Sequence, residues 1–181
     1  MIALPLLLAL APPAVAADET ERATLVLVRA LAYDRALPER ADDPIDIGVL
    51  HGAGRDSQRS ASAALRSLAA LKGVKVAGLP IGAPRDVEAA GLALETQRME
   101  GLDVLLAVRG VSEADLAAAR AFCGERDVLL VSLDPDHVGH GATLAVQAEE
   151  GRLQLVWHRS TADDQGARLS GELLAMAREV P

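Results

Sequence analysis

Short runs of consecutive apolar residues alternate along the chain with segments in which apolar residues recur every three or four positions. The runs cover residues 45–50, 74–79, 102–108 and 128–133, with one charged residue in each of the first three. We expect a strand in each, and the apolar stretches within 102–108 and 128–133 are typical of strands buried on both faces of a parallel sheet. The periodic segments predict helices over residues 20–37, 57–71, 86–97 and 112–122. Strands that alternate with helices indicate a parallel sheet with right-handed crossover connections.

Two of these helices carry further expectations. Residues 24–28 (Thr-Leu-Val-Leu-Val) could form a strand instead of part of the first helix, because β-branched residues favour strands. Ser112 followed by Asp115 predicts a helix N-cap with a capping-box partner. Gly124 predicts the end of that same helix.

The pattern changes after residue 134. Residues 143–146 and 153–157 are separated by Glu149-Glu150-Gly151, which predicts an antiparallel hairpin around a glycine turn. A last helix is predicted over residues 163–180, and its apolar stripe consists of Leu169, Leu173, Ala177 and Val180. The predicted fold class is therefore α/β: a three-layer sandwich with a mixed, mainly parallel sheet and a C-terminal antiparallel hairpin.

The N-terminus has the order of a secretory signal peptide. Residues 1–11 are almost wholly apolar, and two prolines and the small residues 14–17 follow. We expect cleavage after Ala16 or Ala17, which assigns residues 1–17 to the signal peptide and residues 18–181 to one exported domain. A membrane-spanning helix would need about 20 apolar residues, and Asp18 ends the run too early. No membrane insertion is therefore expected after cleavage.

Composition narrows the function. The chain has 18 Lys and Arg against 26 Asp and Glu, a formal net charge of −8, which argues against a nucleic-acid partner. Its single cysteine, Cys123, excludes an internal disulfide. Cys123 lies at the end of an apolar helical pattern, so we expect it to be buried, and a disulfide between chains is the alternative.

A glycine-containing loop follows the first predicted strand. His51-Gly52-Ala53-Gly54 lies where a phosphate-binding loop would be found. Ser57 stands where the third glycine would fall, and no Lys-Ser/Thr pair follows. We therefore interpret the segment as a tight turn into a helix capped by Asp56 or Ser57.

Two histidines and three serines are candidate chemical sites. His137 and His140, beside Asp134 and Asp136, have metal-ligand types, but Pro135 and Gly139 favour a solvated polar loop. Ser132, Ser160 and Ser170 lie in no G-x-S-x-G nucleophile elbow. The sequence predicts no catalytic residue, no cofactor and no metal ion.

The C-terminal third resembles the end of YfiR-like proteins. The strand from Glu150 to His158 is followed by a Gly-x-x-Leu-Ser-x-x-Leu-Leu-x-x-Ala segment, and a Gly-x-Gly segment precedes both. The matching positions are Gly139, Gly141, His158, Gly166, Leu169, Ser170, Leu173, Leu174 and Ala177. The order of leader, N-terminal helix and first strand also matches the family, whereas its Trp-Pro pair and the paired cysteines of some members are absent.

The resemblance implies a periplasmic, non-enzymatic regulatory protein. YfiR-like proteins restrain a membrane diguanylate cyclase through its periplasmic part and tend to form homodimers, so the implied partner is a membrane protein with a periplasmic domain. A small-ligand receptor is the alternative, because one lobe of a periplasmic solute-binding protein has the same alternation of strands and helices. A hydrolase is a third class, and no motif supports it.

Overall fold

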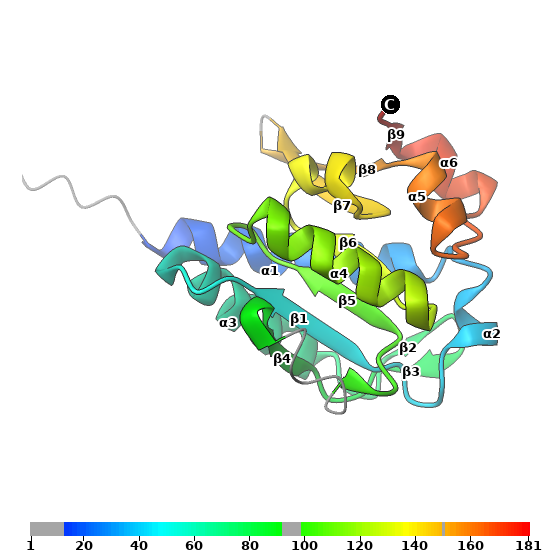
Figure 1. Cartoon of the computed structure of the whole chain (residues 1–181), viewed down its shortest axis with the longest axis horizontal. Coiled ribbons are helices and arrows are strands. Elements are labelled where there is room, and N and C mark those ends of the chain that lie inside the picture. Colours follow the sequence, from blue (N-terminus) through cyan, green and yellow to red (C-terminus); the bar gives the residue numbers. More distant parts are fainter. Residues whose placement is uncertain (1–12, 92–98, 150) are drawn as a thin grey trace, which may run out of the picture.

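A computed structural model describes residues 13–91, 99–149 and 151–181 of the chain. Its centre is a seven-stranded sheet with the order β4-β1-β5-β6-β7-β8-β9 (Figure 1). The strands are β1 (Ile47–His51), β4 (Arg85–Glu88), β5 (Val104–Ala107), β6 (Leu129–Ser132), β7 (Leu144–Glu149), β8 (Arg152–Trp157) and β9 (Arg178–Glu179). Five neighbouring strands, β4 to β7, run parallel, whereas β8 is antiparallel to β7 and β9 is parallel to β8. The predicted fold class and the C-terminal hairpin are confirmed.

Helices cover both faces of this sheet and form the three layers. Strands β1, β5 and β6 are buried along their whole length, as their continuous apolar sequence predicts. On one face, α1 (Pro13–Leu31) and α3 (Arg55–Ala70) pack through residues such as Leu27 and Leu68. On the other face, α4 (Glu113–Arg126) packs through Leu116 and Phe122 (Figure 1). Successive strand residues point to opposite faces, so each central strand contributes to both cores.

The helices predicted over residues 20–37, 57–71 and 112–122 are confirmed as α1, α3 and α4, with different bounds. Residues 24–28 are helical, so their interpretation as a strand is wrong, and the chain leaves α1 for a separate turn, α2 (Leu37–Arg40). The Ser112 hydroxyl accepts a hydrogen bond from the N–H of Asp115 at 3.2 Å, which confirms the predicted cap. Gly124 does not end α4: the helix continues to Arg126 and stops at Asp127, whose φ is 55°.

Two predicted elements before β5 are wrong. Residues 74–79 form β2 (Lys75–Val76) and β3 (Leu79–Pro80), a hairpin outside the main sheet, because Ala77 and Gly78 turn the chain with φ of 51° and 92°. The expected helix over 86–97 begins as strand β4 and a 3-10 turn, η1 (Ala89–Gly91), and residues 92–98 lie outside the described part. Val87 is buried between exposed Asp86 and Glu88, a strand alternation too short to recognise in the sequence.

The expected last helix is also wrong, because three elements take its place. They are α5 (Arg159–Asp164), α6 (Gly171–Met176) and strand β9. Gly166 has a φ of 65°, and Ser170 begins α6 by accepting a hydrogen bond from the N–H of Leu173 at 3.3 Å. Three residues of the predicted stripe still share one core, because Leu173 is fully buried and Leu169 and Ala177 pack against the same cluster. Val180 packs against a separate small cluster instead.

The predicted signal peptide falls mostly outside the described residues, and its last residues belong to the start of α1. Among the helices of the described residues, none is both long and apolar enough to cross a membrane.

Candidate ligand crevice at the carboxyl edge of the sheet

The order of the strands marks one edge of the sheet as the candidate site. The chain goes from β1 to β4 on one side and then to β5 on the other side, so the strand order reverses between β1 and β5. In open α/β sheets, ligands bind outside the carboxyl ends of the strands at such a reversal. Here that place lies between the loop that leads into α3 and the loop that leads into α4.

Two glycines bring these loops into contact. A Cβ atom on Gly52 would lie 2.9 Å from the carbonyl oxygen of Gly110, which is closer than real Cβ contacts. The N–H of Gly52 donates to the hydroxyl of Ser57 at 3.0 Å, and Gly110 packs against Ser57 with a φ of 81°. Ser57 is therefore buried between the two loops and contacts both. The expected helix cap by Ser57 or Asp56 is wrong, because the N-cap of α3 is Gly54.

A cavity of about 200 Å³ opens beside this contact. Its polar lining residues are Thr20, Asp56, Arg59, Ser60 and Arg109. The Arg109 guanidinium lies 2.6 Å from the Glu19 carboxylate and also donates to the carbonyl oxygen of Leu133 at 3.3 Å. The hydroxyl oxygen of Ser60 is buried and has no hydrogen-bond partner within the described residues. The cavity is thus lined by charged side chains of both signs.

These charges define what the crevice can hold. Arg59 lies 3.1 Å from Asp56, so each guanidinium at the cavity has one carboxylate beside it, and both ion pairs are solvent-accessible. Exposed pairs of this kind contribute about 0–1 kcal/mol and rearrange readily. A ligand carboxylate can therefore bind a guanidinium in bidentate fashion, and a ligand ammonium group can replace the arginine beside an acid.

His51 lies at the end of β1, outside the cavity. Its Nε2 lies 3.1 Å from Oδ1 of Asp86 at the end of β1 and β4, and its Nδ1 lies 2.9 Å from the carbonyl oxygen of Gly52. The ring is buried, so His51 joins β4 to the turn after β1 and does not point into the cavity described above.

Ser132 and His137 form an enclosed pair at the end of β6. The Ser132 hydroxyl lies 2.7 Å from Nδ1 of His137, and both side chains are buried. The hydroxyl also accepts the N–H of Asp134 at 2.9 Å, which holds the start of η3 (Pro135–His140). Burial lowers the pKa of His137, while the carboxylates of Asp134 and Asp136 oppose this effect. The expectation of a solvated loop is wrong for His137, which stabilises the loop from inside the protein.

His140 has different surroundings from His137. It is exposed, and its Nε2 lies 3.7 Å from Oε1 of Glu113 in α4. The described residues contain no group of three or more His, Cys, Asp or Glu side chains that could hold a metal ion. Cys123 is fully buried, as expected, and burial raises the pKa of its thiol to about 12. Ser160 lies 3.2 Å from Nδ1 of His158 at the exposed start of α5.

The residues that match the YfiR-like motif form turns, begin a helix or pack in the core. Gly139 lies in η3, and at Gly141 a Cβ atom would meet the Arg120 side chain at 2.7 Å. His158 accepts the N–H of Thr161 at the start of α5. Gly166, Leu169, Ser170, Leu173, Leu174 and Ala177 turn the chain and pack α6 against the sheet. None of these positions lines the crevice.

Two buried polar residues that the sequence did not reveal fix the C-terminal segment. Asp34 accepts the N–H groups of Ala36 and Arg168 at 3.0 and 2.9 Å, and its carboxylate pairs with Arg40. Gln165 accepts the N–H of Leu130 at 2.8 Å and donates to the carbonyl oxygen of Gly141 at 2.8 Å. Their partners are distant in sequence, so no local pattern identifies them.

The crevice arginines were missed as well, although one signal was available. Arg109 directly follows a continuous apolar run, which places it at the carboxyl end of a parallel strand. Arg59 lies one turn into α3, the helix that follows β1. A basic residue at each of these places is the pattern that could have indicated the site.

Comparisons with known proteins support the fold. No family model matches the chain, and no curated protein matches it, so the YfiR-like resemblance stays an expectation. Three similar solved structures are a conserved domain protein from Vibrio cholerae (16% identity, TM-score 0.59), the ABC domain in complex with L-Trp from Streptococcus pneumonia (12%, 0.62), and a ligand-free, open substrate binding protein with adhesive properties from Clostridium difficile (11%, 0.56). They cover 90%, 90% and 80% of this chain, which in turn covers 60%, 60% and 57% of theirs. At these identities the comparisons establish the α/β fold alone.

Proposed function

We propose that this chain is a non-enzymatic domain that binds a small zwitterionic ligand, such as an amino acid, in the crevice at the carboxyl edge. The observation that carries the proposal is the cavity at the strand-order reversal, lined by Arg59 and Arg109 with Asp56 beside them. The two guanidinium groups supply a carboxylate site, and the acidic side chains supply an ammonium site. One structural neighbour holds L-Trp, an amino acid of this chemistry.

The proposed ligand is small because the cavity is small. A volume of about 200 Å³ suits a molecule of amino-acid size better than a nucleotide or an oligosaccharide. The chain spans about three fifths of the length of its structural neighbours. The side chains of Asp56 and Arg59 are largely exposed, so a ligand in this crevice would keep one side open to solvent. We therefore expect weaker binding than in a closed two-lobed receptor.

The proposed compartment is the periplasm, with cleavage after Ala16 or Ala17. Such a cut would shorten α1 by a few residues and leave the Glu19–Arg109 ion pair and the buried face from Ala23 onward in place. Mass spectrometry of the exported protein should find a mature N-terminus at Ala17 or Asp18. An intact Met1 on protein in the cytoplasm would contradict the proposal.

The test is thermal unfolding across a panel of the common amino acids. A ligand present at a hundred times its Kd stabilises a protein by about 2.7 kcal/mol, which gives a clear rise in Tm. Arg109→Ala should abolish that rise, whereas Arg126→Ala, which changes an exposed arginine at the far end of α4, should preserve it. No rise with any amino acid, or a rise that survives both Arg109→Ala and Arg59→Ala, would refute the proposal.

Regulation of a membrane protein, as in YfiR-like proteins, is the second candidate function. The large apolar side chains of Met176 and Leu25, which are 57% and 37% exposed, favour a protein partner. Site-specific photo-crosslinking from position 176 in intact cells should capture a membrane protein with a periplasmic domain, such as a diguanylate cyclase. Crosslinks only to soluble proteins would contradict this role.

A further inference from the structure

Strand β8 has one edge without a neighbouring strand along its first residues. Strand β9 pairs with Val156 and Trp157, and this parallel register uses the carbonyl group of Leu155 as well, so within the described residues no strand lies beside Arg152–Gln154 on that side. The N–H of Val180 donates to the carbonyl oxygen of Trp157 at 2.9 Å, which shows that Trp157 directs its backbone groups toward β9. Backbone groups alternate along an antiparallel strand, so Leu153 and Leu155 direct theirs to the same side.

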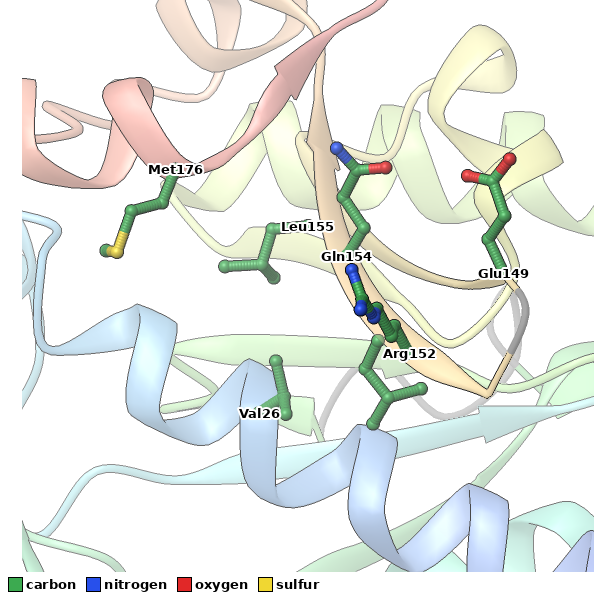
Figure 2. A pocket seen from close by; sticks show the side chains of 7 residues that line it. Val26, Glu149, Arg152, Gln154, Leu155 and Met176 are labelled. Carbon is green, nitrogen blue, oxygen red and sulfur yellow. The ribbon is translucent and has the colours of Figure 1, made fainter.

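This edge borders a groove of about 530 Å³, which we call the β8 groove. Val26, Arg152, Leu153, Gln154, Leu155 and Met176 line it. Figure 2 shows Leu155 extending from β8 into the space between Val26 of α1 and Met176 of α6. The wall toward α1 is therefore apolar, and the opposite face of the strand carries Arg152 and Gln154. An added strand would meet apolar side chains on one face and polar ones on the other.

Four arginines lie at the β8 groove or on the elements beside it. Arg22 and Arg29 are exposed and lie one turn before and after Val26, on the same face of α1. Arg152 lies at the groove itself, and Arg178 in β9 contacts only the amide of Gln147. None of the four forms an ion pair within the described part of the chain, and Glu149 is the acidic residue that lines the groove. On a protein with a net charge of −8, this is a local basic surface.

We propose that the β8 groove binds an extended acidic segment of a partner protein as an added edge strand. The backbone of the segment would pair with Leu153 and with the N–H of Leu155. Its apolar side chains would contact Val26 and Met176, and its acidic side chains, on the opposite face, would lie beside Arg152 and Arg178. Strand addition to an open edge gives affinity through backbone hydrogen bonds and specificity through alternate side chains. This site is separate from the small-ligand crevice and does not depend on it.

Charge decides between a partner segment and a second copy of this chain. Two copies that paired through β8 would bring two sets of arginines together, with one Glu149 from each to offset them. Like charges at an interface oppose association, whereas an acidic segment meets complementary charge. The groove therefore fits an acidic partner better than it fits itself.

The probe is a synthetic peptide of alternating glutamate and valine, six residues long, with a matched peptide of alternating lysine and valine. Titration into the full chain at low salt, followed by NMR of the backbone amides, should move the Leu153 and Leu155 signals first. The acidic peptide should bind at least about tenfold more tightly than the basic one, and added salt should reduce the difference.

Three variants locate the binding. Arg152→Glu and Met176→Asp change exposed side chains and should each weaken the acidic peptide about tenfold while Tm stays near that of the parent. Lys72→Glu makes the same charge change at an exposed position outside the groove and should alter the affinity by less than about twofold. Equal affinity for the two peptides, a dissociation constant above about 5 mM for both, or signal changes away from β8 would overturn the proposal. A dimer in sedimentation that Met176→Asp dissociates would also overturn it and assign the groove to a second copy.

Discussion

At the scale of single residues, the close approach of Gly52 to Gly110 leaves no room for a side chain at position 52. Gly52→Ala would place a methyl group 2.9 Å from a backbone oxygen, so one loop must move. We expect a loss of about 1–3 kcal/mol in the free energy of unfolding and weaker ligand binding. Gly54→Ser is the matched control: no atom lies within 4 Å of its Cβ position, serine suits the N-cap that Gly54 occupies, and we expect a change within about 0.5 kcal/mol. Urea unfolding of both variants checks this, and equal effects would contradict the contact.

Asp103, a buried residue at the start of β5, predicts a specific pH dependence. Burial raises the pKa of its carboxyl group, although the N–H of Asp46, which donates to it at 2.8 Å, opposes the shift. The nearby carboxylates of Asp46 and Asp42 raise this pKa further. Above the unfolded-state pKa of about 4, the native state therefore holds more protons than the unfolded state, and stability falls as pH rises through the native pKa.

Asp103→Asn tests this effect, because asparagine can still accept the Asp46 N–H but does not ionise. The difference in unfolding free energy between the variant and the parent should move in favour of the variant as pH rises from about 4 to 7. Urea unfolding at several pH values measures it. A difference that is constant over this range, or that moves in favour of the parent, would show that the carboxylate is not penalised by burial.

At the scale of elements, α6 has opposite expectations on its two faces. Leu173 is fully buried, so Leu173→Ala should leave a cavity and cost about 2–5 kcal/mol. Met176 on the same helix is 57% exposed, and Met176→Ala should change stability by less than about 0.5 kcal/mol. Thermal unfolding followed by circular dichroism distinguishes them. If Leu173→Ala leaves Tm unchanged, α6 does not pack against the sheet as described.

The elements that could be predicted from the sequence are those whose burial is complete or strictly periodic. Strands β1, β5 and β6 are buried on both faces, and α3 has one regular apolar face, so each has an unambiguous pattern. Strand β4 has one buried residue, Val87, which fits a helix as well as a strand. The break between α5 and α6 depends on the left-handed turn at Gly166, and the sustained apolar spacing around it concealed this break.

The candidate site could be predicted only in part, because it depends on which strands become neighbours. The glycines after β1 predict a tight turn but no ligand site, and the contact with Gly110 follows from the position of β5 beside β1. Arg109 and Glu19 meet across 90 positions of sequence. Asp34 and the N–H of Arg168 meet across 134 positions. Such contacts are set by tertiary packing, which hydrophobic periodicity does not encode.

At the scale of the whole molecule, the two cores share one sheet. Leu106 belongs to the core under α1 and α3, while its neighbour Leu105 belongs to the core under α4. Loss of either core therefore exposes the same strands. The β7–β8 hairpin, which carries the groove, extends the first core through Trp157 and the half-buried side chains of Leu153 and Leu155. We infer that ligand crevice, groove and both helical layers unfold as one unit.

The single tryptophan makes this cooperativity measurable. Trp157 is 5% exposed and lies in the core under α1 and α3, so its fluorescence reports that face, whereas circular dichroism reports the helices of both faces. The two signals should give one coincident urea transition. Leu116→Ala, a cavity in the opposite core, should cost about 2–5 kcal/mol and move the Trp157 transition as far as the circular dichroism transition. Leu68→Ala on the tryptophan side should do the same and serves as the matched variant. If Leu116→Ala shifts the dichroism but leaves the Trp157 transition in place, the two faces unfold separately and residues 18–181 do not form a single cooperative domain.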